Sequence, residues 1–167
     1  MAASVLVAYA PRYGFTQEVA EAVAAALRED GITVDVQPLK AVTALETYRA
    51  VVLGAPLQMS RWHKDALAFL DRHRTALARR AAAVFALGPF HDEEQEWQEV
   101  RAQLDKELAK FPWFSPVAVE VFGANTLGLR WKLIPALKNM PASDTRDWAA
   151  VKSWANTLPE KLQLVGE

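Results

Sequence analysis

Apolar and polar residues alternate along the chain in two different periods, which predict strands and helices in turn. Residues 4–9 (SVLVAY) form a short apolar run bounded by turn signals, which predicts a buried parallel strand. Residues 16–29 repeat apolar side chains at helical spacing, and Gly31 suits the position just after a helix end. The predicted buried face of this helix consists of Val19, Ala20, Val23, Ala24 and Leu27.

The same two patterns continue to the end of the chain. Further strands are predicted at 32–39, an exposed edge strand, at 50–54, ended by Gly54 and Pro56, at 81–88 and at 115–124. Further helices are predicted at 62–77, 92–111 and 146–158, and residues 125–145 are irregular apart from a helix at 131–137. Their expected inward side chains are Ala66, Phe69, Leu70, His73, Leu77, Trp97, Val100, Leu104, Leu108, Trp148, Val151, Ala155 and Leu158.

Alternation of strands and helices along the whole chain predicts an α/β fold. We expect a single domain over residues 1–167, a doubly wound five-stranded parallel sheet in the order 2-1-3-4-5 with helices on both faces. In such a sheet the ligand crevice lies at the carboxyl ends of strands 1, 3 and 4.

Composition narrows the class of protein. Nineteen basic and twenty acidic residues leave a net charge of -1, without the basic surplus that a nucleic-acid-binding protein needs. The absence of cysteine excludes disulfides, cysteine-ligated metal sites and thiol catalysis. The first residues carry no basic segment, and no run of about 18 apolar residues occurs, so we expect neither a signal peptide nor a transmembrane segment and a cytoplasmic location.

The turn after the first strand, from Ala10 to Thr16, indicates what the crevice binds. It contains neither the G-x-G-x-x-G of dinucleotide-binding folds nor the G-x-x-x-x-G-K-[ST] of P-loops, and it lacks the paired acids of a phospho-receiver domain. Gly14 and Thr16 remain, and a glycine turn, a hydroxyl and a helix N-terminus together suit a monophosphate. Alternatively, Gly14 is an ordinary turn glycine and Thr16 only caps the helix.

At these residues the sequence resembles the flavodoxin-like family, whose phosphate loop has the form T-x-T-G-x-T. The branch closest in pattern is the menaquinone-dependent protoporphyrinogen oxidase, with a loop of the form T-R-[YD]-G-x-T. Gly54, Ala55 and His63 match a further turn and histidine of that branch, and residues 130–138 and 144–148 resemble its C-terminal region. The residues in the place of the phosphate loop are Pro11, Arg12, Tyr13, Gly14, Phe15 and Thr16.

The resemblance implies an FMN-binding electron-transfer protein or oxidoreductase. The phosphate would lie against residues 11–16, and the flavin ring would lie between the 55–62 loop and the 88–92 loop. Since the flavin supplies the chemistry, no catalytic side chain is expected, and the partner would be a redox protein or a small-molecule electron acceptor. The implied FMN contacts are Pro11, Arg12, Tyr13, Gly14, Phe15, Thr16, Ala55, Pro56, Leu57, Gln58, Trp62, Gly88, Pro89, Phe90 and His91.

Some of these positions have a structural interpretation beside the functional one. Trp62 either stacks on the flavin or belongs to the core, and His63 is either functional or a helix cap. Residues 129–140 correspond to an insert that in the oxidase branch faces quinone, porphyrin or membrane, which would allow peripheral membrane contact. Pro135 interrupts this segment and argues against a long amphipathic helix. The alternative interpretation is a loop packed on the domain edge.

The chain departs from the family pattern at three positions. Pro11 replaces a threonine, Pro56 replaces a serine and Gln58 replaces an arginine. Pro11 offers a phosphate neither a hydroxyl nor a backbone N–H, although Arg12 could restore a charged contact. Three functions therefore stay open: an FMN-dependent electron carrier, a protoporphyrinogen oxidase with a quinone acceptor, and a flavin-free interaction domain that kept the fold.

If the phosphate lies against Pro11, Pro11→Thr should tighten FMN by about 1–2 kcal/mol, or about 5- to 30-fold, because it restores two hydrogen-bonding groups. Riboflavin, which has no phosphate, should gain nothing. Fluorescence titration of both flavins against both proteins measures the effect. Equal gains for the two flavins, or no gain for either, would place the phosphate elsewhere.

Overall fold

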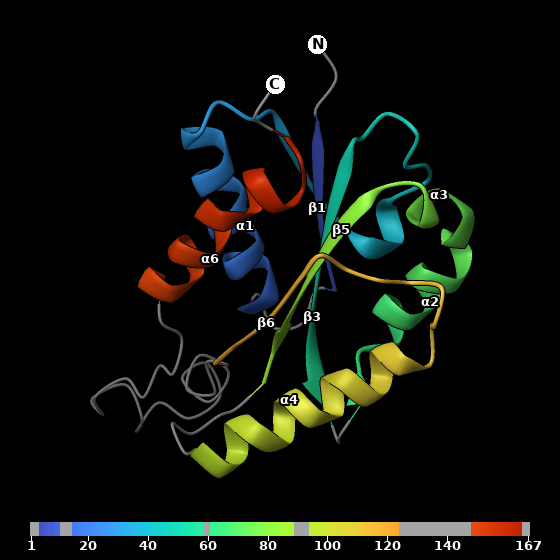
Figure 1. Ribbon diagram of the computed structural model, residues 1–167, viewed down its shortest axis with the longest axis vertical. Coiled ribbons are helices and arrows are strands. Elements are labelled where there is room, and N and C mark those ends of the chain that lie inside the picture. Colours follow the sequence, from blue (N-terminus) through green and yellow to red (C-terminus); the bar gives the residue numbers. More distant parts are fainter. Residues whose placement is uncertain (1–3, 11–14, 59–60, 89–93, 124–147, 165–167) are drawn as a thin grey trace, which may run out of the picture.

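The computed structural model describes residues 4–10, 15–58, 61–88, 94–123 and 148–164 (Figure 1). The predicted helix at 131–137 lies outside these ranges. The elements are, in chain order, β1 (Val5–Tyr9), α1 (Phe15–Glu29), β2 (Val34–Pro38), the 3-10 turn η1 (Leu39–Ala41), β3 (Ala50–Gln58), β4 (Arg61–Trp62), α2 (Lys64–Arg72), α3 (Arg74–Ala78), β5 (Ala81–Leu87), α4 (Glu94–Ala109), β6 (Ala118–Phe122) and α6 (Trp148–Lys161).

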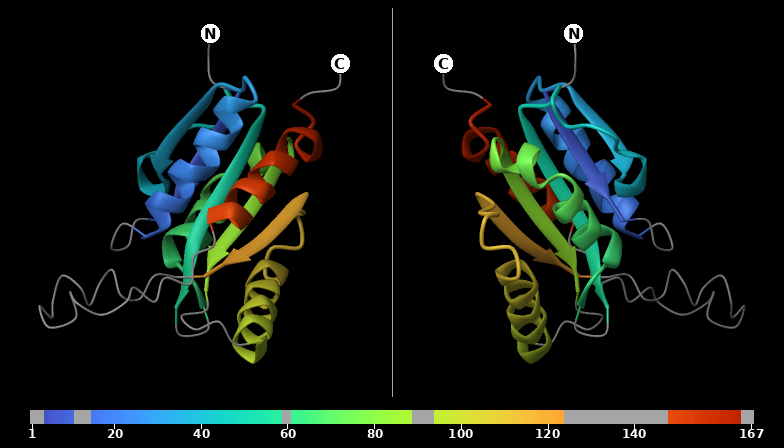
Figure 2. Two further views of the ribbon diagram at one scale, coloured as in Figure 1. Left: turned by 90° about the vertical axis from the view of Figure 1, so that its left-hand side faces the viewer. Right: turned by 90° about the vertical axis from the view of Figure 1, so that its right-hand side faces the viewer.

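Five parallel strands form the sheet in the order β2-β1-β3-β5-β6. This confirms the predicted order 2-1-3-4-5, because β5 and β6 are the fourth and fifth parallel strands along the chain, and it confirms that β2 lies at an edge. In Figures 1 and 2, α1 and α6 cover one face of the sheet, and α2 and α3 cover the other.

The core is divided by the sheet into two apolar clusters. Along β1, Val5, Val7 and Tyr9 belong to the cluster beneath α1 and α6, whereas the alternate residues Leu6 and Ala8 belong to the opposite cluster. Because both faces are covered, the strand is apolar at every position. The predicted inner face of α1 is confirmed, since Val19, Ala20, Val23, Ala24 and Leu27 are fully buried.

The C-terminal end of α1 also follows the prediction. Gly31 has a φ of 82°, in the left-handed region that favours glycine. The Gly31 N–H donates to the Arg28 carbonyl at 3.0 Å, and the Ile32 N–H donates to the Leu27 carbonyl at 3.2 Å. These are the two hydrogen bonds of a Schellman motif, which turns the chain from α1 toward β2.

The third strand is longer than predicted. It continues through Gly54 and Pro56 to Gln58 and pairs antiparallel with β4 in a hairpin. Opposite it, β1 ends at Tyr9, which pairs with Gly54. Pro56 has no N–H for the next bond of this ladder, which would go to the Ala10 carbonyl, so the pairing with β1 ends here and the proline lies at an unpaired strand edge.

Two predictions about the segments that connect the strands are wrong. The predicted helix 62–77 is two helices, α2 and α3, separated by His73, whose φ and ψ of -107° and 24° are not helical. Its predicted inner face is nevertheless buried as expected. Strict alternation would place a helix between β2 and β3. The chain has only the 3-10 turn η1 there, so the predicted alternation is wrong at this point.

The C-terminal helix differs from the prediction in its inner face. Trp148 was expected to face inward but is 41% exposed, whereas Trp154 is buried and lies 6.1 Å from Phe85 and 5.7 Å from Phe122, ring centre to ring centre. The helix also extends to Lys161 with Pro159 inside it. In α4, Leu104 is buried as predicted, while Trp97, Val100 and Leu108 are only partly buried against the core.

His73, in the bend between α2 and α3, gives folding a pH dependence. Burial and the neighbouring Arg72 charge lower the pKa of His73 below its ordinary value of 6.5, against the opposing effects of Glu46 and a hydrogen bond with the Val42 backbone. At a pH between the folded and unfolded pKa values, His73 is therefore protonated in the unfolded chain but neutral in the folded protein. The contribution to stability is therefore complete above the unfolded pKa and declines as the pH falls below it.

We expect His73→Gln to reduce this decline, which for one proton cannot exceed about 1.4 kcal/mol per pH unit. Urea denaturation of both proteins at about pH 8 and about pH 5.5 gives the comparison. The variant should gain relative to the wild type at the lower pH. A difference in unfolding free energy that is the same at both pH values would contradict the assignment to His73.

Candidate functional site

The carboxyl ends of β1, β3 and β5 meet at one end of the sheet. The Ala10 N–H donates to the Gly54 carbonyl at 2.9 Å, and Pro56 pairs with Leu87 of β5. The Gly88 N–H in turn donates to the Phe122 carbonyl at 2.9 Å. These contacts fix the predicted crevice region in register, because each strand end is bonded to its neighbour.

Thr16 lies in the first turn of α1, which follows β1 at this end of the sheet. Its side chain is fully buried, and within the part of the chain that the structure describes its Oγ1 atom makes no hydrogen bond. The capping interpretation of Thr16 is therefore wrong: the helix already begins at Phe15, and the hydroxyl accepts no backbone N–H. Leaving a buried hydroxyl unpaired costs about 1–3 kcal/mol.

The hairpin of β3 and β4 forms the next part of the region. Leu57 pairs with Trp62, and the His63 N–H donates to the Pro56 carbonyl at 3.1 Å. Ala55 is buried, while Pro56 and Leu57 are partly exposed. The hairpin thus presents a short, mainly apolar surface beside the ends of β1 and β5.

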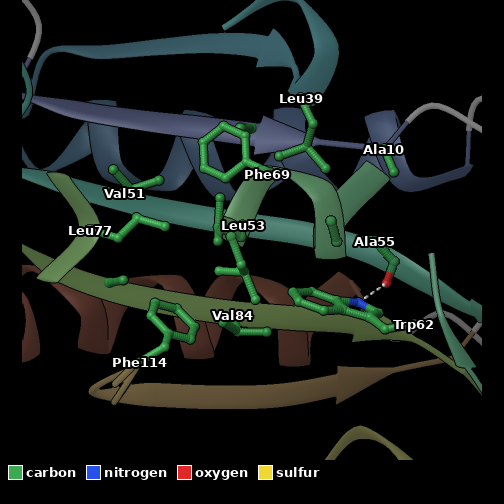
Figure 3. Close-up of a cluster of buried hydrophobic side chains, with 14 of the residues drawn as sticks. Ala10, Leu39, Val51, Leu53, Ala55, Trp62, Phe69, Leu77, Val84 and Phe114 are labelled. Carbon is green, nitrogen blue, oxygen red and sulfur yellow. Dashed lines mark hydrogen bonds between the residues drawn. The ribbon is translucent and has the colours of Figure 1, made fainter. Parts of the chain in front are cut away.

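Trp62 faces the core and not the crevice. Its side chain is 1% exposed and belongs to the apolar cluster that includes Leu53 and Val84. Its Nε1–H donates to the Ala55 carbonyl at 3.0 Å, as Figure 3 shows. A buried indole with its one donor satisfied offers no open ring face, so the structure corrects the prediction that Trp62 covers the flavin and supports its interpretation as a core residue.

His63 is the N-cap of α2. Its Nδ1 atom accepts a hydrogen bond from the Asp65 backbone N–H at 3.0 Å. This agrees with the structural interpretation of the histidine and explains why α2 begins at Lys64 and not at Trp62. The Asp65 carboxylate is itself 9% exposed and lies 3.8 Å from the Lys40 ammonium group.

The two glycines at the strand ends are required by packing. A Cβ at Gly54 would overlap the ring of Phe85, and a Cβ at Gly88 would overlap the side chain of Val100 from α4. Gly88 was predicted as a cofactor contact, and the structure gives it a second role, the close approach of α4 to the end of β5. Of the remaining predicted contacts, residues 11–14 and 89–91 and the side chains of Phe15 and Gln58 lie outside what the structure describes.

Glu107 was missed by the sequence analysis. It is 3% exposed, and its carboxylate lies 3.6 Å from Arg61 Nε in the hairpin and 2.8 Å from Lys110 Nζ. A signal was available, because Glu107 follows Leu104 by three positions and Val100 by seven, and so falls on the predicted inner face of α4. A carboxylate on an apolar helix face indicates that a positively charged side chain lies next to it, because buried charges are paired.

The described residues contain neither a candidate metal site nor a candidate membrane span. In the described ranges, no three His, Asp or Glu side chains gather in a way that could hold a metal ion. None of the helices in those same ranges combines the length and the apolar character that a membrane span needs.

A family model described as "Flavodoxin domain" matches residues 6–133. The chain belongs to the flavodoxin domain family. Its sheet order is the one predicted from the alternation of strands and helices, and FMN is the cofactor of this family.

Solved structures share the flavodoxin fold across most of the chain. Oxidised flavodoxin 2 from Bacillus cereus is 20% identical, with a TM-score of 0.63 over 95% of this chain and 99% of that chain. The rubredoxin oxygen:oxidoreductase of Desulfovibrio gigas is 17% identical, with a TM-score of 0.56 over 96% of this chain but only 36% of its own. At these identities the likeness shows the fold alone.

A curated relative is more similar in sequence over a shorter region. It is named NAD(P)H dehydrogenase (quinone), from Acidovorax ebreus (strain TPSY), and is 33% identical over 99 residues. The match covers 46% of this chain and 50% of that protein, so this chain spans about half the length of the relative.

The described residues of this flavodoxin domain fit FMN at one end of the site. The unpaired, buried Thr16 hydroxyl at the N-terminus of α1 is a donor without an acceptor, and a phosphate oxygen would supply the acceptor. Pro56 and Leu57, next to the buried Ala55, offer an apolar surface of the kind that borders a flavin ring. Trp62 does not offer a stacking face.

We expect Trp62→Ala to lower the unfolding free energy by about 3–5 kcal/mol, because it removes a fully buried aromatic side chain. Trp62→Phe should cost less, about 1–3 kcal/mol, since it keeps most of the apolar volume and loses only the hydrogen bond to the Ala55 carbonyl. Urea denaturation measures both. If Trp62→Ala leaves stability unchanged and weakens only flavin binding, the stacking interpretation is the correct one.

Proposed function

We propose that this chain binds FMN non-covalently and acts as an FMN-dependent electron carrier or oxidoreductase. The observation that carries the proposal is the Thr16 hydroxyl, which is fully buried at the first turn of α1 and unpaired among the described residues. When bound, FMN supplies the redox chemistry.

In this proposal the chain contributes binding and orientation. The Thr16 hydroxyl and backbone N–H groups at the N-terminus of α1 donate to the phosphate, and the helix dipole favours its negative charge. Ala55, Pro56, Leu57 and Gly88 border the ring and exclude water from one side of it. Residues 11–14 and 89–91 belong to the proposed site on sequence grounds.

The electron acceptor belongs to the finer part of the proposal. The relative named as a quinone dehydrogenase favours a quinone as the acceptor. The protoporphyrinogen oxidase activity draws no support from the relatives described above and rests on the sequence pattern of the branch. A redox protein as partner remains the alternative to a small-molecule acceptor, and the single-domain organisation over residues 1–167 belongs to the proposal as well.

Thr16→Val tests the phosphate end of the site. The variant keeps the shape of the side chain and removes the hydroxyl, so it should weaken FMN by about 10- to 150-fold, as expected for the loss of a hydrogen bond to a charged group. Without ligand, the same variant should be as stable as the wild type or up to about 1 kcal/mol more stable, because the lost hydroxyl had no partner. Fluorescence titration with FMN and urea denaturation of the ligand-free protein measure the two effects.

Thr16→Ser is the matched control, because it keeps the hydroxyl and should retain FMN affinity. Riboflavin is the second control, and its affinity should be the same for all three proteins. If micromolar wild-type protein leaves FMN fluorescence unchanged, the chain is the flavin-free interaction domain. If FMN binds but Thr16→Val binds it as tightly as the wild type, the phosphate does not lie at Thr16.

A further inference from the structure

An ion cluster around one buried carboxylate joins α4 to the hairpin of β3 and β4. The Glu107 carboxylate lies on the inner face of α4 and is 3% exposed. Two cations reach it: Arg61 Nε from β4 at 3.6 Å, and Lys110 Nζ at 2.8 Å, just beyond the end of α4. A carboxylate at this depth requires such partners to remain charged.

The two cations have different structural consequences. Lys110 lies three residues after Glu107 on the same segment, so this pair stabilises only the end of α4. Arg61 lies in a separate element, so its pair with Glu107 connects the hairpin to the helix. In Figure 1, α4 lies across the end of the sheet where β3 ends, beside the hairpin.

The other hydrogen bonds at the hairpin close it on itself. Trp62 donates to the Ala55 carbonyl, and His63 donates to the Pro56 carbonyl. These bonds set the internal shape of the hairpin, but they do not determine how it sits against α4. Apolar packing joins the two elements, since Trp62 and Leu104 belong to one core cluster, and the pair of Arg61 and Glu107 adds a charged link between them.

The energetics of an ion pair with one buried partner indicate the role of this cluster. Desolvation of the carboxylate opposes much of the attraction between the charges, and the Arg61 side chain is 68% exposed to solvent, so the pair adds little net stability. The best-attested use of such a pair is to select one arrangement among alternatives. Here the arrangement selected is the position of Ala55, Pro56 and Leu57, the three described hairpin residues that border the proposed flavin ring.

We infer that Glu107 is a positioning residue: through Arg61 it holds the β3–β4 hairpin against α4 and thereby sets the affinity of the site for the flavin ring. This inference rests on the proposed FMN binding. It assigns the ring end of the site to an ion pair, whereas the phosphate end is assigned to Thr16.

The experiment removes one cation at a time from the same carboxylate. Arg61→Gln should weaken riboflavin and FMN by the same factor, about three- to tenfold, because the hairpin loses its link to α4. Lys110→Gln removes the shorter of the two ion pairs and should leave both affinities within about twofold, because the hairpin link stays intact. Glu107→Gln, which keeps the Arg61 side chain, should weaken both flavins as Arg61→Gln does.

Hydrogen exchange of the ligand-free proteins gives a reading that does not depend on flavin. The His63 amide, which is bonded to Pro56, should exchange faster in Arg61→Gln and Glu107→Gln than in the wild type, and at the wild-type rate in Lys110→Gln. Faster exchange in this pattern, even without any flavin binding to the wild type, would uphold the link between hairpin and helix and overturn only the proposed function.

Three results would overturn the inference. Unchanged riboflavin affinity in Arg61→Gln would mean that the ion pair does not affect binding of the flavin ring. An effect on FMN alone would mean that Arg61 acts on the phosphate. Weakening by Arg61→Gln but not by Glu107→Gln would mean that Arg61 contacts the flavin itself and that Glu107 has no positioning role.

Discussion

β1 ends opposite Gly54, but β3 continues to Gln58, and this difference in strand length shapes the candidate site. Up to Gly54 the hydrogen-bonding groups of β3 are shared with β1, the last of them with Ala10. Beyond it no β1 residue faces β3, and the chain folds back so that His63 supplies the donor for Pro56. The hairpin, the orientation of Trp62 and the start of α2 at Lys64 all follow from this one requirement that the exposed strand edge be satisfied.

The same requirement makes the Thr16 hydroxyl informative. Polar groups elsewhere in the described core have partners: Trp62 donates to Ala55, and Tyr48 donates to Asp35 at 2.7 Å, where burial and that hydrogen bond raise the pKa of Tyr48 to about 12. Among the described side chains, two buried atoms have none, Thr16 Oγ1 and His73 Nε2. His73 can reduce its cost by staying neutral. A hydroxyl has no such option, so among the described residues Thr16 keeps an unmet hydrogen bond that a phosphate oxygen would accept.

How much the sequence could predict depends on whether a feature is local. The parallel strands and the inner face of α1 are visible in the spacing of apolar residues, because burial on both faces leaves no polar position in β1. The extension of β3 is not visible, because it depends on where β1 stops, and Gly54 and Pro56 therefore look like terminators. Trp62 was placed in a helix for the same reason, and its Nε1–H bond to Ala55 exists only once the hairpin does. Glu107 is the opposite case, a polar residue on an apolar face whose partner lies 46 positions away at Arg61.

The two ends of the proposed site depend on different interactions. The phosphate end depends on the backbone of α1 and on one hydroxyl, which are fixed by the packing of Val19, Ala20 and Val23 under the sheet. The proposed ring end depends on a hairpin that the ion pair of Arg61 and Glu107 links to α4. Substitutions around Arg61 and Glu107 can thus alter how the ring is held without disturbing the phosphate, whereas a change in the first turn of α1 acts on the phosphate alone. A flavodoxin domain arranged in this way can keep its cofactor while the surface that meets the electron acceptor changes.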